Sequence, residues 1–371
     1  MTAAKIPSLY VHVPFCASIC YYCDFFRQVY RKETADAWLN ALEYELQHAD
    51  INEGIETIYI GGGTPSSLSE SQLDRLLSLL DPYKNKISEY TVEVNPETVT
   101  QAKIDLLLKH GVNRVSIGLQ SHDAALLKKL NRNHSFEDVG RLVNQFSACG
   151  ISNISLDLMY SLPTQTMESL QRSTELAVSL NPSHLSLYSL TIEENSVFGK
   201  QGVRPLDEDT EADMYEWICS YLTDHGYDHY EISNFARDGK ESLHNTRIWE
   251  YEDFYGFGCG ASGKDEKGRY DHPGTLKQYL ADPAARTYTY LSKEERMYET
   301  VMMGLRLSRG ISHTRFRKMY GIDLTEVYPE SIASLCREGM LILTEDRLFC
   351  SAHGFELLNT VLVRFMEEAD L

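Results

Sequence analysis

The sequence predicts an α/β protein: a partial (β/α) barrel of the TIM type, followed by a smaller helical domain that resembles a winged helix. Three observations predict this fold. Strand-like runs alternate with amphipathic helices through the first two-thirds of the chain, and polar residues recur just after the strands. After about residue 240 the rhythm changes. We therefore divide the chain into a barrel domain over 1–240 and a C-terminal domain over 241–371.

The predicted strands are rich in β-branched and aromatic residues. They span 8–15, 57–62, 90–96, 114–120, 154–163, 184–192 and, more weakly, 228–236. Amphipathic helices lie between them, for example at 33–49, 69–83 and 167–182. Six or seven such units predict a parallel sheet, which either an open doubly wound sheet or a barrel would satisfy. Thr64, Glu93, Gln120 and Asp157 follow strand ends, which favours a barrel with its site at the C-terminal mouth.

The C-terminal third begins with a stretch over 241–275 that is rich in glycine and aromatic residues, and we expect an irregular connection there. Helices follow from 293–307 onward, with a hairpin over 341–350. Winged-helix modules often bind DNA, but this one carries many acidic residues. We expect it to pack against or gate the barrel. The glycines of "GCGASG" (258–263) fit a dinucleotide-binding pattern by chance, and we expect a turn-forming loop.

Charge and composition exclude several functions. The net charge is -19, and the 35 lysines and arginines form no run, so we expect no nucleic-acid partner. No segment approaches the ~18 apolar residues of a membrane span. Five of the eight cysteines are scattered singly, which suits a reducing compartment better than a disulfide framework. We expect a cytoplasmic protein.

Cys16, Cys20 and Cys23 have the spacing C-x3-C-x2-C directly after the first strand. Three interpretations are open. The thiols could be free, or they could hold zinc with His12 as a fourth ligand, although no second ligand pair follows downstream. They could also hold a 4Fe-4S cluster, in which three thiolates leave one iron open to another ligand. An open iron could chelate S-adenosylmethionine and cleave its carbon-sulfur bond to give a radical.

The triplet in this position resembles the radical S-adenosylmethionine superfamily. "YVHVPFCASICYYCDF", "GGGTP", "VEVNP", "RVSIGLQS", "LDLMYSLPTQT" and "HLSLYSLTIEENS" are similar to the branch that contains oxygen-independent coproporphyrinogen III dehydrogenases and HemW-type haem chaperones. The resemblance implies a 4Fe-4S cluster on the three cysteines and S-adenosylmethionine beside it. The implied contacts of S-adenosylmethionine are Tyr10, Tyr22, Gly62, Gly63, Thr64 and Glu93. Gln120, Arg132, Asp157 and Thr191 match positions that contact a second nucleotide-sized ligand.

Two branches compete for the function. The dehydrogenase pattern has a further cysteine where Phe25 stands, and a longer N-terminal extension. "YEISNFA" (230–236) and "LHNTRIW" (243–249) are similar to motifs of the chaperone branch, with Ile248 replacing a tyrosine. We therefore favour a haem chaperone, with the dehydrogenase or another porphyrin-modifying radical enzyme as the alternative. Whether the chain is an enzyme stays open.

The chaperone resemblance implies that haem is cargo, delivered to haem-dependent respiratory or storage proteins. Axial ligands of haem are His, Cys, Met or Tyr. His244 is the candidate, although an ordinary hydrogen-bonded histidine is an equal interpretation. The family usually has histidine where Ser262 stands, which weakens any haem site on that loop. Peripheral membrane contact, and the choice between monomer and homodimer, are left open.

Overall fold

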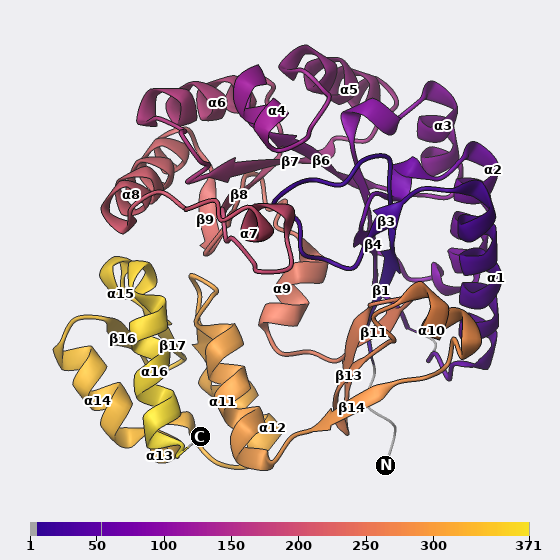
Figure 1. Ribbon diagram of the computed structural model, residues 1–371. Helices are drawn as coiled ribbons and strands as arrows, with labels where there is room; N and C mark the ends of the chain where they lie inside the picture. Colours follow the sequence, from indigo (N-terminus) through magenta and orange to yellow (C-terminus); the bar gives the residue numbers. More distant parts are fainter. Residues whose placement is uncertain (1–5, 53, 371) are drawn as a thin grey trace.

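The computed structural model describes residues 6–52 and 54–370. Across these residues twelve strands form one open sheet, in the order β14-β13-β12-β11-β1-β4-β5-β6-β7-β8-β10-β9 (Figure 1). Its edges are β14 and β9, so the barrel is partial, as predicted. The parallel strands that form its wall are β1 (Ser8–Val13), β4 (Thr57–Gly62), β5 (Glu89–Val94), β6 (Arg114–Gln120), β7 (Asn153–Tyr160) and β8 (His184–Ser189).

The outward positions of these strands are apolar and pack under the surrounding helices. In β1, Leu9, Val11 and Val13 are fully buried in the main core. The inward positions alternate with them, because successive side chains of a strand point to opposite faces. Barrel interiors are usually filled by branched apolar residues. Here, instead, many inward positions are polar, including Thr91, Ser116, Ser155 and Ser186.

Helices cover the outside of the sheet (Figure 1). The helices of the barrel region are α1 (Lys32–His48), α2 (Glu70–Leu80), α3 (Gln101–Lys109), α4 (Ala124–Lys129), α5 (Phe136–Ala148), α6 (Met167–Ser179), α7 (Val197–Lys200) and α8 (Glu208–Asp224), with 3-10 turns η1 (Pro65–Ser67), η2 (Asp81–Tyr83) and η3 (Pro96–Thr98). Sequence signals set their ends: Ser69 and Ser135 each form a capping box at the start of a helix. Two short strands, β2 (Phe15–Cys16) and β3 (Gln28–Val29), bracket the cysteine loop.

The predicted strand over 228–236 is wrong in part, since it is a hairpin. β9 (Asp228–Glu231) and β10 (Asn234–Ala236) are antiparallel, and β10 also runs antiparallel to β8. Ile232 and Ser233 form the turn between them. These two residues carry no glycine or proline, so the alternating pattern hides the turn.

The expected irregular connection over 241–275 is also wrong. It contains α9 (Leu243–Trp249) and strands β11 (Phe254–Phe257), β12 (Ser262–Asp265) and β13 (Gly268–Asp271), followed by α10 (Leu276–Ala281) and β14 (Thr287–Tyr290). The glycines reflect close strand packing: a Cβ at Gly256 would overlap the carbonyl group of Ser262, and one at Gly263 would overlap the ring of Tyr270. The first four residues of "GCGASG" form the turn between β11 and β12, as expected, while its last two residues begin β12.

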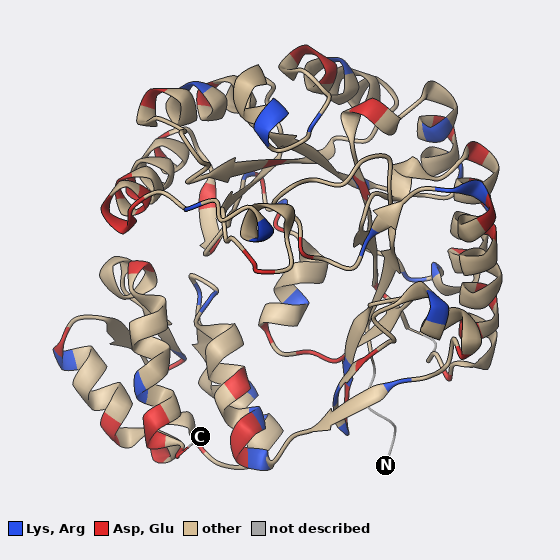
Figure 2. Cartoon of the chain, viewed as in Figure 1, with Lys and Arg blue, Asp and Glu red and all other residues tan. Residues whose placement is uncertain are grey.

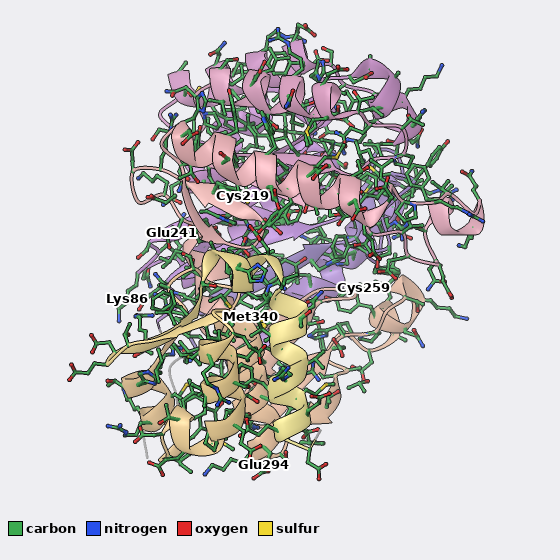
Figure 3. All side chains as sticks on the ribbon, turned by 90° about the vertical axis from the view of Figure 1, so that its left-hand side faces the viewer. Lys86, Cys219, Glu241, Cys259, Glu294 and Met340 are labelled. Carbon is green, nitrogen blue, oxygen red and sulfur yellow. The ribbon has the colours of Figure 1, made fainter. Side chains whose placement is uncertain are left out.

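The C-terminal region has its own apolar core, which runs from Met297 to Phe365. It consists of α11 (Lys293–Gly304), α12 (His313–Tyr320), α13 (Leu324–Val327), α14 (Pro329–Arg337), α15 (Ala352–Glu356) and α16 (Leu358–Glu368), with the small sheet of β15 (Ile311–Ser312), β16 (Leu341–Leu343) and β17 (Arg347–Cys350). Figure 3 shows this region, with Met340 and Glu294, below the barrel helix that carries Cys219. Because the main sheet continues to β14, the division at residue 240 stays a prediction.

Charged segments of both signs alternate over the outer helices in the view of Figure 2. No helix in the described part of the chain is long and apolar enough to cross a membrane.

Candidate functional site

A cavity of about 470 Å³ lies inside the barrel and opens beside the cysteine loop. It brings together residues that are far apart in the sequence, because the carboxyl ends of parallel strands meet at one mouth. The predicted residues that line it are Cys16, Cys20, Tyr22, Cys23, Gly62, Gly63, Thr64, Glu93, Gln120, Arg132, Asp157 and Thr191. Tyr10 and His244 were predicted as well, but neither lines the cavity.

The three cysteines of the triplet share this cavity. The Thr64 hydroxyl donates to Cys16 Sγ at 3.7 Å, and Arg132 Nη1 donates to Cys20 Sγ at 3.7 Å. Burial raises the pKa of Cys16 to about 12. Burial also raises the pKa of Cys23, although the nearby Arg27 opposes that shift. Thiols in such a place ionise when a metal centre supplies positive charge, so the donor set fits an iron-sulfur cluster.

His12 does not fit the zinc interpretation. Its Nδ1 is hydrogen-bonded to the Tyr10 hydroxyl at 3.0 Å and its Nε2 to the carbonyl oxygen of Phe26 at 2.8 Å, so both ring nitrogens are engaged. Among the described residues, no three His, Cys, Asp or Glu side chains are grouped around a point that could hold one metal ion. His12 and Tyr10 instead hold the strand against the far end of the cysteine loop.

The glycines of "GGGTP" are required by packing. A Cβ at Gly61 would come within 2.7 Å of the Glu93 carboxyl group, and one at Gly62 within 2.5 Å of the His12 ring. At Gly63 it would approach the backbone of Phe15 within 2.8 Å. Gly62 also has a φ of 101°, which favours glycine. The three glycines therefore fit against the first strand and the Glu93 side chain, while their backbone faces the cavity.

Glu93 is a buried carboxyl group on the cavity wall. It accepts hydrogen bonds from the Tyr59 hydroxyl at 2.8 Å and from the Gly62 amide at 3.2 Å. Burial raises its pKa to about 7, partly opposed by the Tyr59 hydrogen bond. A cationic or hydrogen-bond-donating ligand would restore the ionised form, which is the chemistry that an ammonium or ribose hydroxyl supplies.

Arg132 and Asp157 face the same cavity with opposite charges. Arg132 Nη2 donates to the carbonyl oxygen of Gly118 and to Asn95 Oδ1, each at 2.9 Å. Asp157 accepts from the Ser116 hydroxyl at 2.9 Å, and burial raises the pKa of its carboxyl group. Gln120 ends β6 with a φ of 64°, a strained conformation of the kind that clusters at binding sites.

Sequence reasoning missed several lining residues: Arg114, Ser116, Ser186, Tyr188 and Asn245. The first four occupy inward positions of predicted strands, two residues apart, so the strand period could have identified them. Asn245 comes from α9, which was predicted as part of a loop. Its place at the cavity follows only from the packing of α9 across the barrel.

His244 lies in the same helix but points away from the cavity. Its Nδ1 is hydrogen-bonded to Thr57 Oγ1 at 2.9 Å, and its ring lies against that of Tyr59 in a tilted arrangement, 5.3 Å between centroids. Only 2% of the residue is exposed, and its Nε2 has no hydrogen-bond partner in the described part of the chain. Burial lowers its pKa to about 3.

Comparisons with known proteins agree with this geometry. Residues 10–177 match the model of the radical SAM superfamily, and residues 291–357 match the HemN C-terminal domain. The chain is 39% identical to "Heme chaperone HemW" of Lactococcus lactis, covering 98% of both chains. It is 37% identical to the protein of the same name in Bacillus subtilis, covering 97% of this chain and 99% of the relative.

Among solved structures, the fold is similar to that of coproporphyrinogen III oxidase (HemN) from Escherichia coli. The TM-score is 0.84 at 24% identity, covering 97% of this chain and 90% of that one. The likeness at this identity supports the fold. The full-length matches at higher identity go further: the chain belongs to the HemW family within the radical SAM superfamily.

Proposed function

We propose that the protein is a haem chaperone that holds a 4Fe-4S cluster on Cys16, Cys20 and Cys23, binds S-adenosylmethionine in the adjoining cavity, and delivers haem to haem-dependent proteins. The observation that carries the proposal is the convergence of the three thiols, the Gly62–Thr64 backbone and Glu93 on one cavity. The names of the full-length relatives support haem as the cargo.

The chain's own residues prepare the site in distinct ways. Thr64 and Arg132 donate to the sulfurs of Cys16 and Cys20, which stabilises them as thiolates. Glu93 would accept hydrogen bonds from S-adenosylmethionine. The cluster, when bound, supplies an iron with an open coordination position and a single electron. Tyr22 is half-buried and lines the cavity beside these groups.

His244 remains our proposed haem ligand. Its Nε2 is buried without a hydrogen-bond partner among the described residues, which is unusual for a polar atom and supports the assignment. Because the residue is only 2% exposed, α9 must move to admit an iron atom. His244→Ala should therefore weaken haem binding and leave the iron content of the cluster unchanged.

Anaerobic reconstitution followed by haem titration tests the proposal. We expect about four irons per chain and absorbance near ~400 nm from the cluster, and a haem Soret shift at near-stoichiometric haem. Cys20→Ala should lose the cluster, while Cys149→Ala, which replaces a half-buried cysteine outside the cavity, should retain it. Full iron in Cys20→Ala would refute the ligand assignment, and the absence of a Soret shift in the wild type would refute haem binding.

The alternative function is that of an oxygen-independent coproporphyrinogen III dehydrogenase, and the shared fold favours it. Phe25 argues against it, since it stands where that branch has a cysteine. In the structure Phe25 lines the cavity with 64% of its surface exposed. Incubating the reconstituted protein with S-adenosylmethionine, a reductant and coproporphyrinogen III decides between them: conversion of the porphyrinogen would establish the enzyme.

We propose haem-dependent respiratory or storage proteins as acceptors and the cytoplasm as the place of transfer. Mixing haem-loaded protein with an apo form of such an acceptor, and following the Soret band of each after separation, tests delivery. Light scattering on the same samples separates monomer from homodimer. Retention of all haem by the donor would contradict delivery.

A further inference from the structure

We propose that Arg114 forms a carboxylate-binding subsite deep in the cavity, distinct from the place of S-adenosylmethionine at the cysteine loop. The inference deepens the proposed function and rests on it for the choice of ligands. Arg114 is 2% exposed and lines the cavity, yet its guanidinium donates no hydrogen bond to any residue that the structure describes.

The residues around Arg114 show how unusual this is. It is the first residue of β6, and the first residues of four other parallel strands of the wall are also polar and buried: Ser8, Thr57, Glu89 and His184. Thr57 donates to Ser8 at 2.9 Å and also bonds His244. His184 bonds Ser155 and the Tyr230 hydroxyl, each at 2.8 Å. Each of these residues finds a partner within the protein, and Arg114 alone among them does not.

Arg132 provides a second comparison, because it is another buried arginine of the same cavity. Its guanidinium donates to Gly118, Asn95 and Cys20, which accounts for its burial. A buried guanidinium without acceptors is strongly unfavourable, so it usually marks the place of a missing partner. The structure thus assigns different roles to the two side chains: Arg132 braces the loop, and Arg114 is available to a ligand.

The nearby carboxylates do not occupy Arg114. Glu89 and Asp157 are close enough to influence its charge, but each is bonded elsewhere. Glu89 accepts the backbone amides of Leu243 and His244, and Asp157 accepts the hydroxyl of Ser116. Asn245, from α9, lines the same cavity and can add an amide donor. Donors with no acceptor, inside a cavity, point to an anionic ligand group.

A carboxylate matches this subsite better than a free inorganic anion, because the rest of the ligand would lie toward the mouth. β6 places the Cα of Arg114 roughly 20 Å from that of Gln120, so a bound molecule must be elongated to reach both regions. Two molecules in the proposed function carry such a group: haem, through a propionate, and a second S-adenosylmethionine, through its α-carboxylate. Both offer a planar acceptor to a guanidinium fork.

Matched ligands that lack the carboxylate test the subsite. Dissociation constants are measured on cluster-loaded protein for haem and its dimethyl ester, and for S-adenosylmethionine and its decarboxylated analogue. For one of the two pairs, we expect Arg114→Gln to weaken binding of the acid roughly ten- to hundredfold and to leave the carboxylate-free analogue unchanged. Arg114→Lys should restore part of the loss. Arg75→Gln, which removes a cation outside the cavity, should change nothing.

Each outcome separates the subsite from the proposed function. Equal weakening of an acid and its analogue, or no effect of Arg114→Gln on any ligand, would overturn the subsite alone. If the wild type binds neither haem nor S-adenosylmethionine, the proposed function and the subsite are overturned together. If Arg114→Gln does not fold, the wild type must still bind one acid at least about tenfold more tightly than its analogue, and Arg114→Lys must reduce that preference.

Discussion

The two ends of the barrel interior carry equally polar residues but treat them differently. At the amino end, Glu89 accepts the first amides of α9, and Thr57 bonds His244. At the carboxyl end, the thiols, Glu93 and Asp157 line a cavity. With the exception of Arg114, which lines the cavity without a hydrogen-bond partner among the described residues, the protein thus supplies its own partners at the amino end and leaves room for a ligand at the carboxyl end. Polar residues inside a barrel are therefore not sufficient evidence of a site; unfilled space and unmatched donors are also needed.

The largest expected effect on stability comes from disrupting the amino end of the barrel interior, which we call the closed end because α9 covers it. Glu89→Ala removes the acceptor of the Leu243 and His244 amides and the carboxylate that most strongly compensates the Arg114 charge. We expect the free energy of unfolding to fall by about 3 kcal/mol or more, measured by urea denaturation. Glu175→Ala, at an exposed ion pair, is the control and should change it by less than about 1 kcal/mol. Equal effects of the two substitutions would show that the hydrogen bonds from α9 to Glu89 contribute no more to stability than an exposed ion pair.

At the carboxyl end, which we call the open end because the cavity lies there, Glu93 should make stability depend on pH. Burial raises the Glu93 pKa from 4.5 to about 7, so its contribution to stability is fully present below pH 4.5 and is lost as pH rises through 7. In cofactor-free protein, the free energy of unfolding should decline between pH 5 and 8. We expect Glu93→Gln to remove roughly 2 kcal/mol of that decline, as measured by urea denaturation at each pH.

A matched control exists for the Glu93 prediction. Burial also raises the pKa of Glu45 to about 7, but Glu45 lies outside the cavity, where it accepts from Gly258 and Tyr279. Bound S-adenosylmethionine should therefore abolish the pH dependence due to Glu93 and spare that due to Glu45. Parallel stability curves for wild type and Glu93→Gln would contradict the assignment.

A smaller effect is expected where the closed end uses neutral groups. Thr57→Val keeps the shape of the side chain but removes the hydrogen bonds to Ser8 and His244. We expect a loss of about 1 kcal/mol in the free energy of unfolding, because a neutral hydrogen bond contributes about that much. Thr287→Val, on the exposed edge strand β14, should be near neutral. A neutral Thr57→Val would mean that His244 does not depend on this bond.

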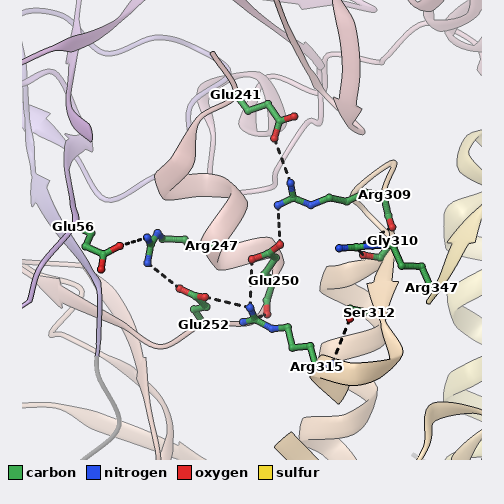
Figure 4. Close-up of polar contacts among 10 residues, drawn as sticks. All are labelled: Glu56, Glu241, Arg247, Glu250, Glu252, Arg309, Gly310, Ser312, Arg315 and Arg347. Atoms are coloured by element: carbon green, nitrogen blue, oxygen red, sulfur yellow. Dashed lines mark hydrogen bonds and ion pairs between the residues drawn. The ribbon is translucent and has the colours of Figure 1, made fainter. Parts of the chain in front are cut away.

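The smallest effect should come from the ion pairs that join α9 to the C-terminal region. Arg309 bonds Glu250 at 2.7 Å and Glu241 at 3.7 Å, and Arg315 bonds Glu250 and Glu252 (Figure 4). Because 39% of the Arg309 side chain is exposed, Arg309→Ala should cost at most about 1 kcal/mol. The cost should vanish at 1 M salt, as measured by denaturation at both ionic strengths. A cost that is independent of salt would point to packing instead.

Much of the site could be predicted from sequence, because local signals placed it. The cysteine spacing, the glycine triplet and the strand alternation pointed to Cys16, Gly62 and Glu93, which line one cavity in the structure. The function of α9 could not be predicted in this way. The helix α9 is only seven residues long, and its first amides depend on Glu89 as their acceptor. Glu89 lies 154 positions earlier than Leu243, so no window of local sequence predicts this helix.

Two further discrepancies have similar causes. Tyr10 follows the inward period of β1, but its hydroxyl bonds His12, so it supports the wall instead of lining the cavity. Arg114 was overlooked, although it lies within the predicted strand over 114–120, because a charged residue at the start of a strand usually meets solvent. Only the closure of the barrel by α9 makes that position an interior one.

The glycine triplet has a consequence for how this family diverges. Because Gly61, Gly62 and Gly63 are held by the side chains and backbone behind them, each would resist substitution even in a descendant that no longer used a cofactor. Cys20 and Cys23 are half-buried on a loop and carry no comparable packing restraint. In a lineage that no longer bound the cluster, we expect the cysteines to be substituted first. "GGGTP" should persist because the packing of the fold still requires its glycines.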